Sequence, residues 1–170
     1  RECYMESGEY LLTRTAFRHL ADRGMKTCLL TAKDKLKSLI RDGVTIAESA
    51  ERPSERLVGR VGAAPGIYTI EVNHWLLRAA RDILRQDCPD FLYVSTTDYV
   101  THTHPPGSEP SRWNIREIDR LIGDIIDDAG DLEMVVTADH GMNAKSRGLN
   151  PEAILAARGI AARAIPIIKD

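Results

Sequence analysis

Two pairs of acid and imidazole side chains give this sequence its chemistry. Asp139 and His140 directly follow an apolar run, within the sequence TADHGMN. Asp98 and His102 follow an earlier apolar run, Phe91–Ser95. Carboxylate oxygen and imidazole nitrogen together are suitable ligands for zinc, manganese or iron. Because such pairs at neighbouring strand ends recur in two-metal hydrolases, the pattern predicts a metal-dependent phosphoryl or phosphonyl hydrolase.

Each pair also has a purely structural interpretation. Asp-His-Gly after a strand can be a plain turn, in which Asp139 bonds nearby backbone amides. Asp98 and His102 are four residues apart, a spacing that lets both side chains reach one ion from a helical turn or a tight loop. Since the two pairs occupy equivalent places after two strands, metal binding is favoured over the turn.

Charge supports metal ions at such a site. Two carboxylates and two neutral imidazoles carry −2, whereas two divalent ions bring +4, so the loaded site attracts an anionic phosphoryl group. Lys33 and Lys35 follow a third apolar run and could hold a substrate carboxylate away from the metals. The alternative for these lysines is a solvated helix start, although cations at a helix amino end are locally unfavourable.

Bulk composition fits one globular domain. The chain has 170 residues, is 43% hydrophobic and 28% charged, and its net charge of −2 argues against a nucleic-acid groove or a membrane-surface patch. No stretch reaches the ~20 apolar residues of a membrane span, and the amino end is too polar for a secretory signal. Cys3, Cys28 and Cys88 show no metal or disulfide spacing, so we expect a cytoplasmic protein with reduced cysteines.

Alternating helical and strand patterns predict an α/β fold with a mainly parallel sheet and helices on both faces. Strands are expected at 26–31, 91–96, 132–138 and 165–168. Helices are expected from Thr13 or Thr15 to Gly24, and at 33–40, 72–84, 115–126 and 153–157. Residues 48–66 hold prolines and glycines among scattered charges and are expected to form a loop or small excursion. Right-handed crossovers would place all strand carboxyl ends, and so the candidate residues, at one edge of the sheet.

With these segments assembled, the sequence resembles the phosphonoacetate hydrolases, in the nucleotide pyrophosphatase/phosphodiesterase-like branch of the alkaline phosphatase superfamily. The resemblance rests on TAKDKL at 31–36, YVSTTDYVTHTHPPG at 93–107 and TADHGMN at 137–143, and it extends over nearly the whole chain. It implies an alkaline-phosphatase-like three-layer α/β sandwich with a binuclear zinc site. It also implies hydrolysis of the carbon–phosphorus bond of phosphonoacetate to acetate and phosphate.

The resemblance also implies roles for six residues. Four match metal ligands of the family, two on each zinc ion: Asp98 and His102 on one, Asp139 and His140 on the other. Lys33 and Lys35 match the lysines that bind the substrate carboxylate. In such enzymes a metal-activated threonine attacks phosphorus, and the metals and lysines stabilise the negative charge that develops at each end.

The sequence departs from the family pattern at both ends. The family's amino-terminal metal-binding Asp, its threonine nucleophile and its last histidine ligand have no counterparts, and capping explains Thr13 and Thr15. We therefore expect residues 1–170 to form one catalytic-type α/β domain from a longer enzyme, incomplete at both ends. Such a chain is expected to bind metal weakly and to turn over substrate poorly or not at all.

Two alternatives and one assembly question stay open at this point. The chain could be a phosphodiesterase or phosphomonoesterase of the same superfamily, in which Lys33 and Lys35 are bystanders. It could also be a non-catalytic α/β domain whose Asp and His residues only shape turns. An unpaired sheet edge would favour association, so a homodimer is allowed.

Overall fold

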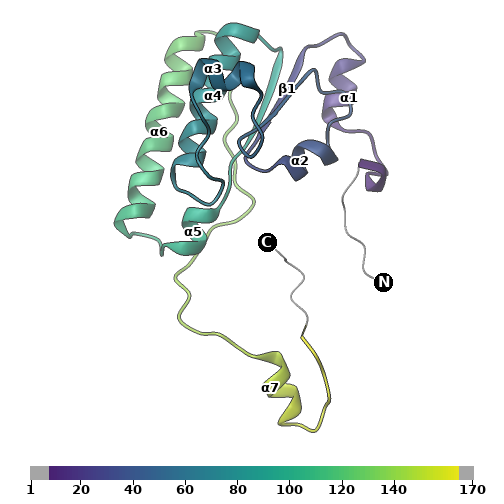
Figure 1. Ribbon diagram of the computed structural model, residues 1–170, viewed down its shortest axis with the longest axis vertical. Helices are drawn as coiled ribbons and strands as arrows, with labels where there is room; N and C mark the ends of the chain where they lie inside the picture. Colours follow the sequence, from purple (N-terminus) through teal and green to yellow (C-terminus); the bar gives the residue numbers. More distant parts are fainter. Residues whose placement is uncertain (1–7, 165–170) are drawn as a thin grey trace.

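Within residues 8–164, the part of the chain that the computed structural model describes, three parallel strands form a sheet between layers of helices (Figure 1). The central strand, β1 (Thr27–Thr31), pairs with β2 (Ile46–Ser49) on one edge and with β3 (Phe91–Ser95) on the other. All five residues of β1 are buried, because it has a strand on each side and helices over both faces. The predicted α/β class with a parallel sheet is therefore confirmed.

Helices cover both faces of the sheet, as expected. On one side lie α1 (Ala16–Ala21) and α2 (Asp34–Leu39); on the other lies α4 (Glu71–Asp87), with α6 (Glu109–Ala129) behind it (Figure 1). The remaining helical elements are short: η1 (Gly8–Tyr10), α3 (Glu55–Val61), α5 (Tyr99–Thr103) and α7 (Pro151–Ala156). Figure 1 shows α7 set apart from the main body, beyond an extended segment that follows α6.

Helix α1 covers its face of the sheet through one aromatic cluster. Thr15 caps the helix, because its Oγ1 accepts a hydrogen bond of 3.1 Å from the Arg18 amide, and this is the capping role expected for it. Phe17 is buried, with its ring centroid 5.7 Å from that of Phe91 and 6.3 Å from that of Tyr93. These edge-on contacts hold α1 against β3.

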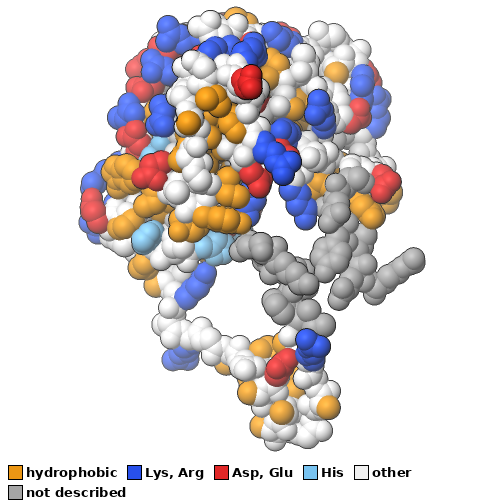
Figure 2. All heavy atoms as spheres, viewed as in Figure 1, with side chains coloured by type: hydrophobic (Ala, Val, Ile, Leu, Met, Phe, Trp, Pro, Cys, Tyr) orange, Lys and Arg blue, Asp and Glu red, His pale blue; other side chains and the backbone are white. Residues whose placement is uncertain are grey.

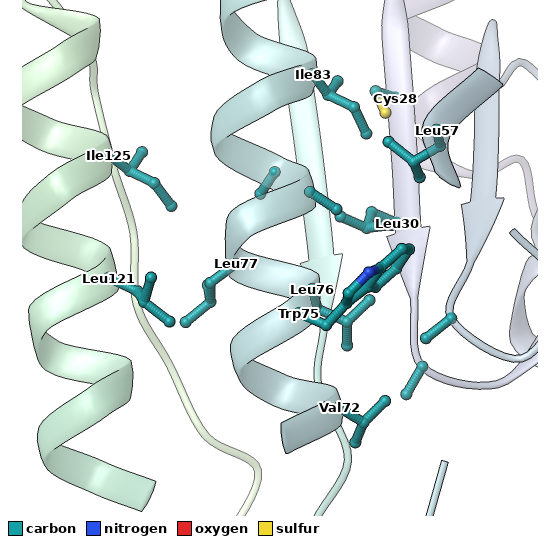
Figure 3. Packing of buried hydrophobic residues seen from close by; sticks show 14 residues of the cluster. Cys28, Leu30, Leu57, Val72, Trp75, Leu76, Leu77, Ile83, Leu121 and Ile125 are labelled. Atoms are coloured by element: carbon teal, nitrogen blue, oxygen red, sulfur yellow. The ribbon is translucent and has the colours of Figure 1, made fainter. Parts of the chain in front are cut away.

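The main hydrophobic core lies between α4 and β1 (Figure 3). Trp75 and Leu30 face each other across this layer and are almost completely buried. On the opposite side of α4, Leu77 points toward Leu121 of α6, so α4 is apolar on two sides. The Trp75 indole also donates a 3.0 Å hydrogen bond to the carbonyl of Gly62, which fixes the chain that leads into α4.

The prediction of a strand at 132–138 was wrong. After α6 the chain descends toward α5 without pairing to a strand (Figure 1). Leu132 and Met134 are half-buried against the core, whereas Val135 is 90% and Val136 is 69% exposed. An apolar run becomes a buried strand only when both its faces are covered, and in the described part of the chain nothing covers these valines. The strand expected at 165–168 falls outside the described residues.

Residues 48–66 contain more regular structure than the loop or excursion expected there. Strand β2 ends at Ser49, and α3 begins after Ser54, whose Oγ accepts a 3.2 Å hydrogen bond from the Leu57 amide. The buried carboxylate of Glu48 accepts hydrogen bonds from the Ser54 amide at 3.0 Å and the Ser54 hydroxyl at 2.6 Å. These bonds tie the end of β2 directly to the start of α3.

A second buried carboxylate, Asp87, joins α3 to the end of α4. Arg56 Nη1 donates to its Oδ1 at 2.7 Å, and Arg60 Nη2 donates to its Oδ2 at 2.8 Å. Burial by itself raises the pKa of Asp87, but the hydrogen bonds from Arg60 and Arg56 outweigh burial, so that its pKa lies below the usual value. The ionised carboxylate therefore stabilises the fold.

We expect Asp87→Asn to lower the free energy of unfolding at pH 7 by about 1.5 kcal/mol, because the amide nitrogen cannot accept a hydrogen bond from one arginine and the other arginine loses its charged acceptor. Since the folded pKa is depressed, this stabilisation is present above the unfolded pKa of about 3.9 and is lost as the pH falls through the folded value. Urea unfolding of both proteins from pH 7 to about pH 3 should show the difference shrinking below about pH 4. A constant difference across that range would contradict this assignment.

Candidate active site

The three parallel strands have their carboxyl ends at the same end of the sheet, which we call the rim. Lys33 follows β1 at this end, and Asp98 follows β3 just before α5. Histidine side chains gather at the same end of the main body, in the region of α5 (Figure 2). Ligands of α/β sheets bind at this end, and the structure places Lys33 and Asp98 there.

Asp98 and His102 lie one helical turn apart and contact each other directly. Nε2 of His102 is 2.7 Å from Oδ2 of Asp98, and the two side chains are 49% and 61% exposed, respectively. A tetrahedral zinc with bonds of about 2.0–2.1 Å keeps two ligand atoms about 3.3 Å apart. The pair therefore fits one zinc ion after an opening of roughly half an ångström, and both donor types suit that metal.

Asp139 and His140 form a local, exposed pair. Oδ1 of Asp139 accepts a 2.9 Å hydrogen bond from the His140 amide, and its Oδ2 lies 3.6 Å from Nε2 of the same histidine. A hydrogen bond from His140 Nδ1 to the Gly141 carbonyl, together with the negative charges of Asp139 and Asp98, raises the pKa of His140 above its usual value. The amide contact of Asp139 is also the one that a plain turn would make.

The segment that carries Asp139 and His140 approaches α5 but does not complete an ion site there. Nζ of Lys145 lies 3.3 Å from Nδ1 of His102, and the charge of Asp98 acts on His140. No group of three or more His, Cys, Asp or Glu side chains that could hold a metal ion occurs among residues 8–164. Residues 132–138 pair with no strand, whereas a strand paired to the sheet would hold Asp139 at the rim.

The two candidate lysines lie at the start of α2, on the exposed side of the rim. Lys33 Nζ is 5.4 Å from the ring centroid of Tyr68, within the range of a cation–π contact. The Tyr68 ring lies 6.0 Å from that of Tyr99, the residue after Asp98. Two aromatic rings thus connect Lys33 to the helix that carries His102. Lys35 is exposed on the first turn of α2.

Three residues near the site were not anticipated from the sequence: Asn73, Tyr68 and Lys145. Asn73 is 3% exposed at the start of α4, and its amide group bonds the backbone of Thr97. Asn73 lies beside apolar residues in the first turn of the amphipathic α4, and this was the available signal for it. Tyr68 and Lys145 lie in segments without an apolar period, so their contacts follow only from the folded chain.

A three-stranded parallel sheet with helices on both faces, and an acid–imidazole pair after β3, defines the class of this protein as an α/β domain. Residues 20–167 match the sequence profile of type I phosphodiesterase / nucleotide pyrophosphatase. The chain belongs to this family.

The chain is similar to two crystal structures of phosphonoacetate hydrolase from Sinorhizobium meliloti 1021. The complex with phosphonoacetate has 27% sequence identity and a TM-score of 0.77, and the match covers 93% of this chain and 43% of that one. The complex with phosphonoformate has 26% identity and a TM-score of 0.68, covering 76% and 35%. The resemblance stated from the motifs is confirmed, and the chain spans less than half the length of these structures. No helix within the described ranges is long and apolar enough to cross a bilayer.

Proposed function

We propose that this chain supplies part of the active site of a zinc-dependent phosphonoacetate hydrolase, which cleaves the carbon–phosphorus bond to give acetate and phosphate. The observation that carries the proposal is the 2.7 Å contact of Asp98 with His102 at the rim that also holds Lys33. The similarity to structures that contain phosphonoacetate or phosphonoformate supports a small anionic phosphonate as the ligand.

In the proposed site, Oδ2 of Asp98 and Nε2 of His102 would hold one zinc ion, and Asp139 and His140 would hold the other. When bound, the two ions would supply Lewis-acid stabilisation of the phosphoryl oxygens. The catalytic nucleophile is not assigned to this chain, because the threonine that performs this role in the family has no counterpart among residues 1–170.

Lys33 and Lys35 would bind the carboxylate of the substrate at the end away from the metals. Both ammonium groups are exposed at the start of α2, where a cation is unfavourable to the helix but is free to meet an anion. The Tyr68 ring beside Lys33 would limit where that ammonium group can point. A carboxylate bound there would lie across the rim from Asp98, which matches a substrate with an anionic group at each end.

The proposal is tested by phosphate release from phosphonoacetate, measured on the full gene product before and after removal of zinc by a chelator. We expect release that is lost with the metal and restored when zinc is added back. In parallel, calorimetry on the present chain should register zinc uptake, weak because the family's other ligands have no counterparts here. No release and no uptake would overturn the proposal.

The second candidate function is hydrolysis of a phosphate ester, and membership of the type I phosphodiesterase / nucleotide pyrophosphatase family favours it. An aryl phosphate monoester and an aryl phosphate diester assayed beside phosphonoacetate separate the two functions. Zinc-dependent cleavage of an ester without cleavage of phosphonoacetate would assign the phosphomonoesterase or phosphodiesterase activity.

Nucleic acid is not an expected partner of this chain. The cytoplasmic location expected from the sequence stays a prediction, and a homodimer stays an open alternative.

A further inference from the structure

Asn73, in the first turn of α4, holds the short loop between β3 and α5. Its Nδ2 donates a 2.8 Å hydrogen bond to the carbonyl of Thr97, and its Oδ1 accepts a 2.9 Å hydrogen bond from the Thr97 amide. The side chain therefore satisfies both backbone groups of one residue, as a neighbouring strand would. Asn73 is 3% exposed, and both of these hydrogen bonds of its buried amide go to this one residue.

The Thr97 backbone needs this support because the sheet ends before it. The last hydrogen bond between the β1 side and β3 is donated by the Ala32 amide to the Ser95 carbonyl at 3.1 Å. Helix α5 begins at Tyr99, so residues 96–98 lie between two regular elements and belong to neither. Asp98 is the next residue along the chain after Thr97, the residue that Asn73 holds, and its carboxylate contacts His102.

We infer that Asn73 is a positioning residue for the proposed metal site: through Thr97 it fixes Asp98 in the orientation that binds zinc. This inference rests on the proposed function, since zinc is the ligand that Asp98 would hold. Asn73 itself would touch neither metal nor substrate. Its anchor is rigid, because its neighbours on α4, Val72 and Trp75, are almost completely buried in the core.

The chain offers a matched control in Asn114. This asparagine is 5% exposed on α6, and its Oδ1 lies 3.1 Å from Nε2 of His74, the residue after Asn73. Replacing either asparagine by alanine removes a buried amide next to the start of α4. Only Asn73→Ala removes the hydrogen bonds to Thr97, so a difference in zinc binding between the variants reports on positioning and not on stability.

Calorimetric titration with zinc tests the inference. We expect Asn73→Ala to weaken zinc binding by about 10- to 100-fold, the range found for residues that orient metal ligands, and Asn114→Ala to change it by less than about threefold. Equal weakening in both variants, or none in Asn73→Ala, would overturn the inference while zinc uptake by the unaltered chain still supported the proposed function. No uptake by the unaltered chain would overturn both.

Hydrogen exchange of the Thr97 amide gives a second readout that needs no metal and no activity. We expect this amide to be protected in the unaltered chain and in Asn114→Ala, and to exchange like an exposed loop amide in Asn73→Ala. A Thr97 amide that exchanges freely in the unaltered chain would overturn the inference even if Asn73→Ala failed to fold.

Discussion

Replacing Asp98, a proposed zinc ligand, by alanine should weaken zinc binding by more than about 100-fold, because loss of a direct ligand costs more than the ~10- to 100-fold lost with a residue that only orients one. Stability should hardly change. The Asp98 side chain is 61% exposed and its partner His102 is 49% exposed, and exposed pairs contribute about 0–1 kcal/mol. We therefore expect a melting temperature within about 4 °C of the unaltered chain, together with a nearly complete loss of zinc uptake in calorimetry.

The control for this prediction is Asp119→Ala. Asp119 is exposed on α6, so its replacement removes the same charge from the surface without touching the rim. Zinc affinity should then change by less than about twofold, since charges on the outer helix are screened at physiological ionic strength. If Asp98→Ala and Asp119→Ala had equal effects, zinc would be responding to net charge, and Asp98 would not be a ligand.

The parallel sheet could be predicted because its main elements carry strong local patterns. Strands β1 and β3 are continuous apolar runs, and α4 and α6 show helical periodicity over several turns. Strand β2 escaped prediction because it has four residues, and one of them, Glu48, is a buried acid. The burial of Glu48 depends on Ser54, and the sequence alone does not show that this serine would provide hydrogen bonds.

In the candidate site too, contacts between residues close in the sequence could be predicted, and contacts between distant residues could not. Asp98 and His102 are four residues apart, so one turn of helix brings them together and the spacing alone predicts their contact. The position of Asp139 and His140 relative to that pair depends on how residues 132–138 cover the sheet, which no local pattern determines. The contact of Asn73 with Thr97 spans 24 residues, and it follows only once α4 lies against β3.

The double replacement Lys33→Ala/Lys35→Ala should weaken binding of phosphonoacetate to the zinc-loaded chain by about 100-fold. Each lysine would donate a hydrogen bond to the substrate carboxylate, and about tenfold per lysine is the low end expected for charged hydrogen bonds at an exposed position. Inorganic phosphate carries no carboxylate, so its affinity should fall by less than about threefold, from the change in charge alone. Competition calorimetry with the two anions measures both constants on the same sample.

Two exposed cations at the opposite ends of the strands provide the control for charge. Arg23→Ala/Arg41→Ala removes two positive charges from the segments that lead into β1 and β2, away from the rim, and should leave the preference for phosphonoacetate over phosphate unchanged. If the Lys33 and Lys35 replacements weakened both anions equally, the lysines would act only as a diffuse positive field. If they weakened neither, these lysines would be bystanders, as the phosphodiesterase and phosphomonoesterase alternatives require. Only selective loss of the carboxylate-bearing ligand assigns the second anionic end of the substrate to this part of the rim.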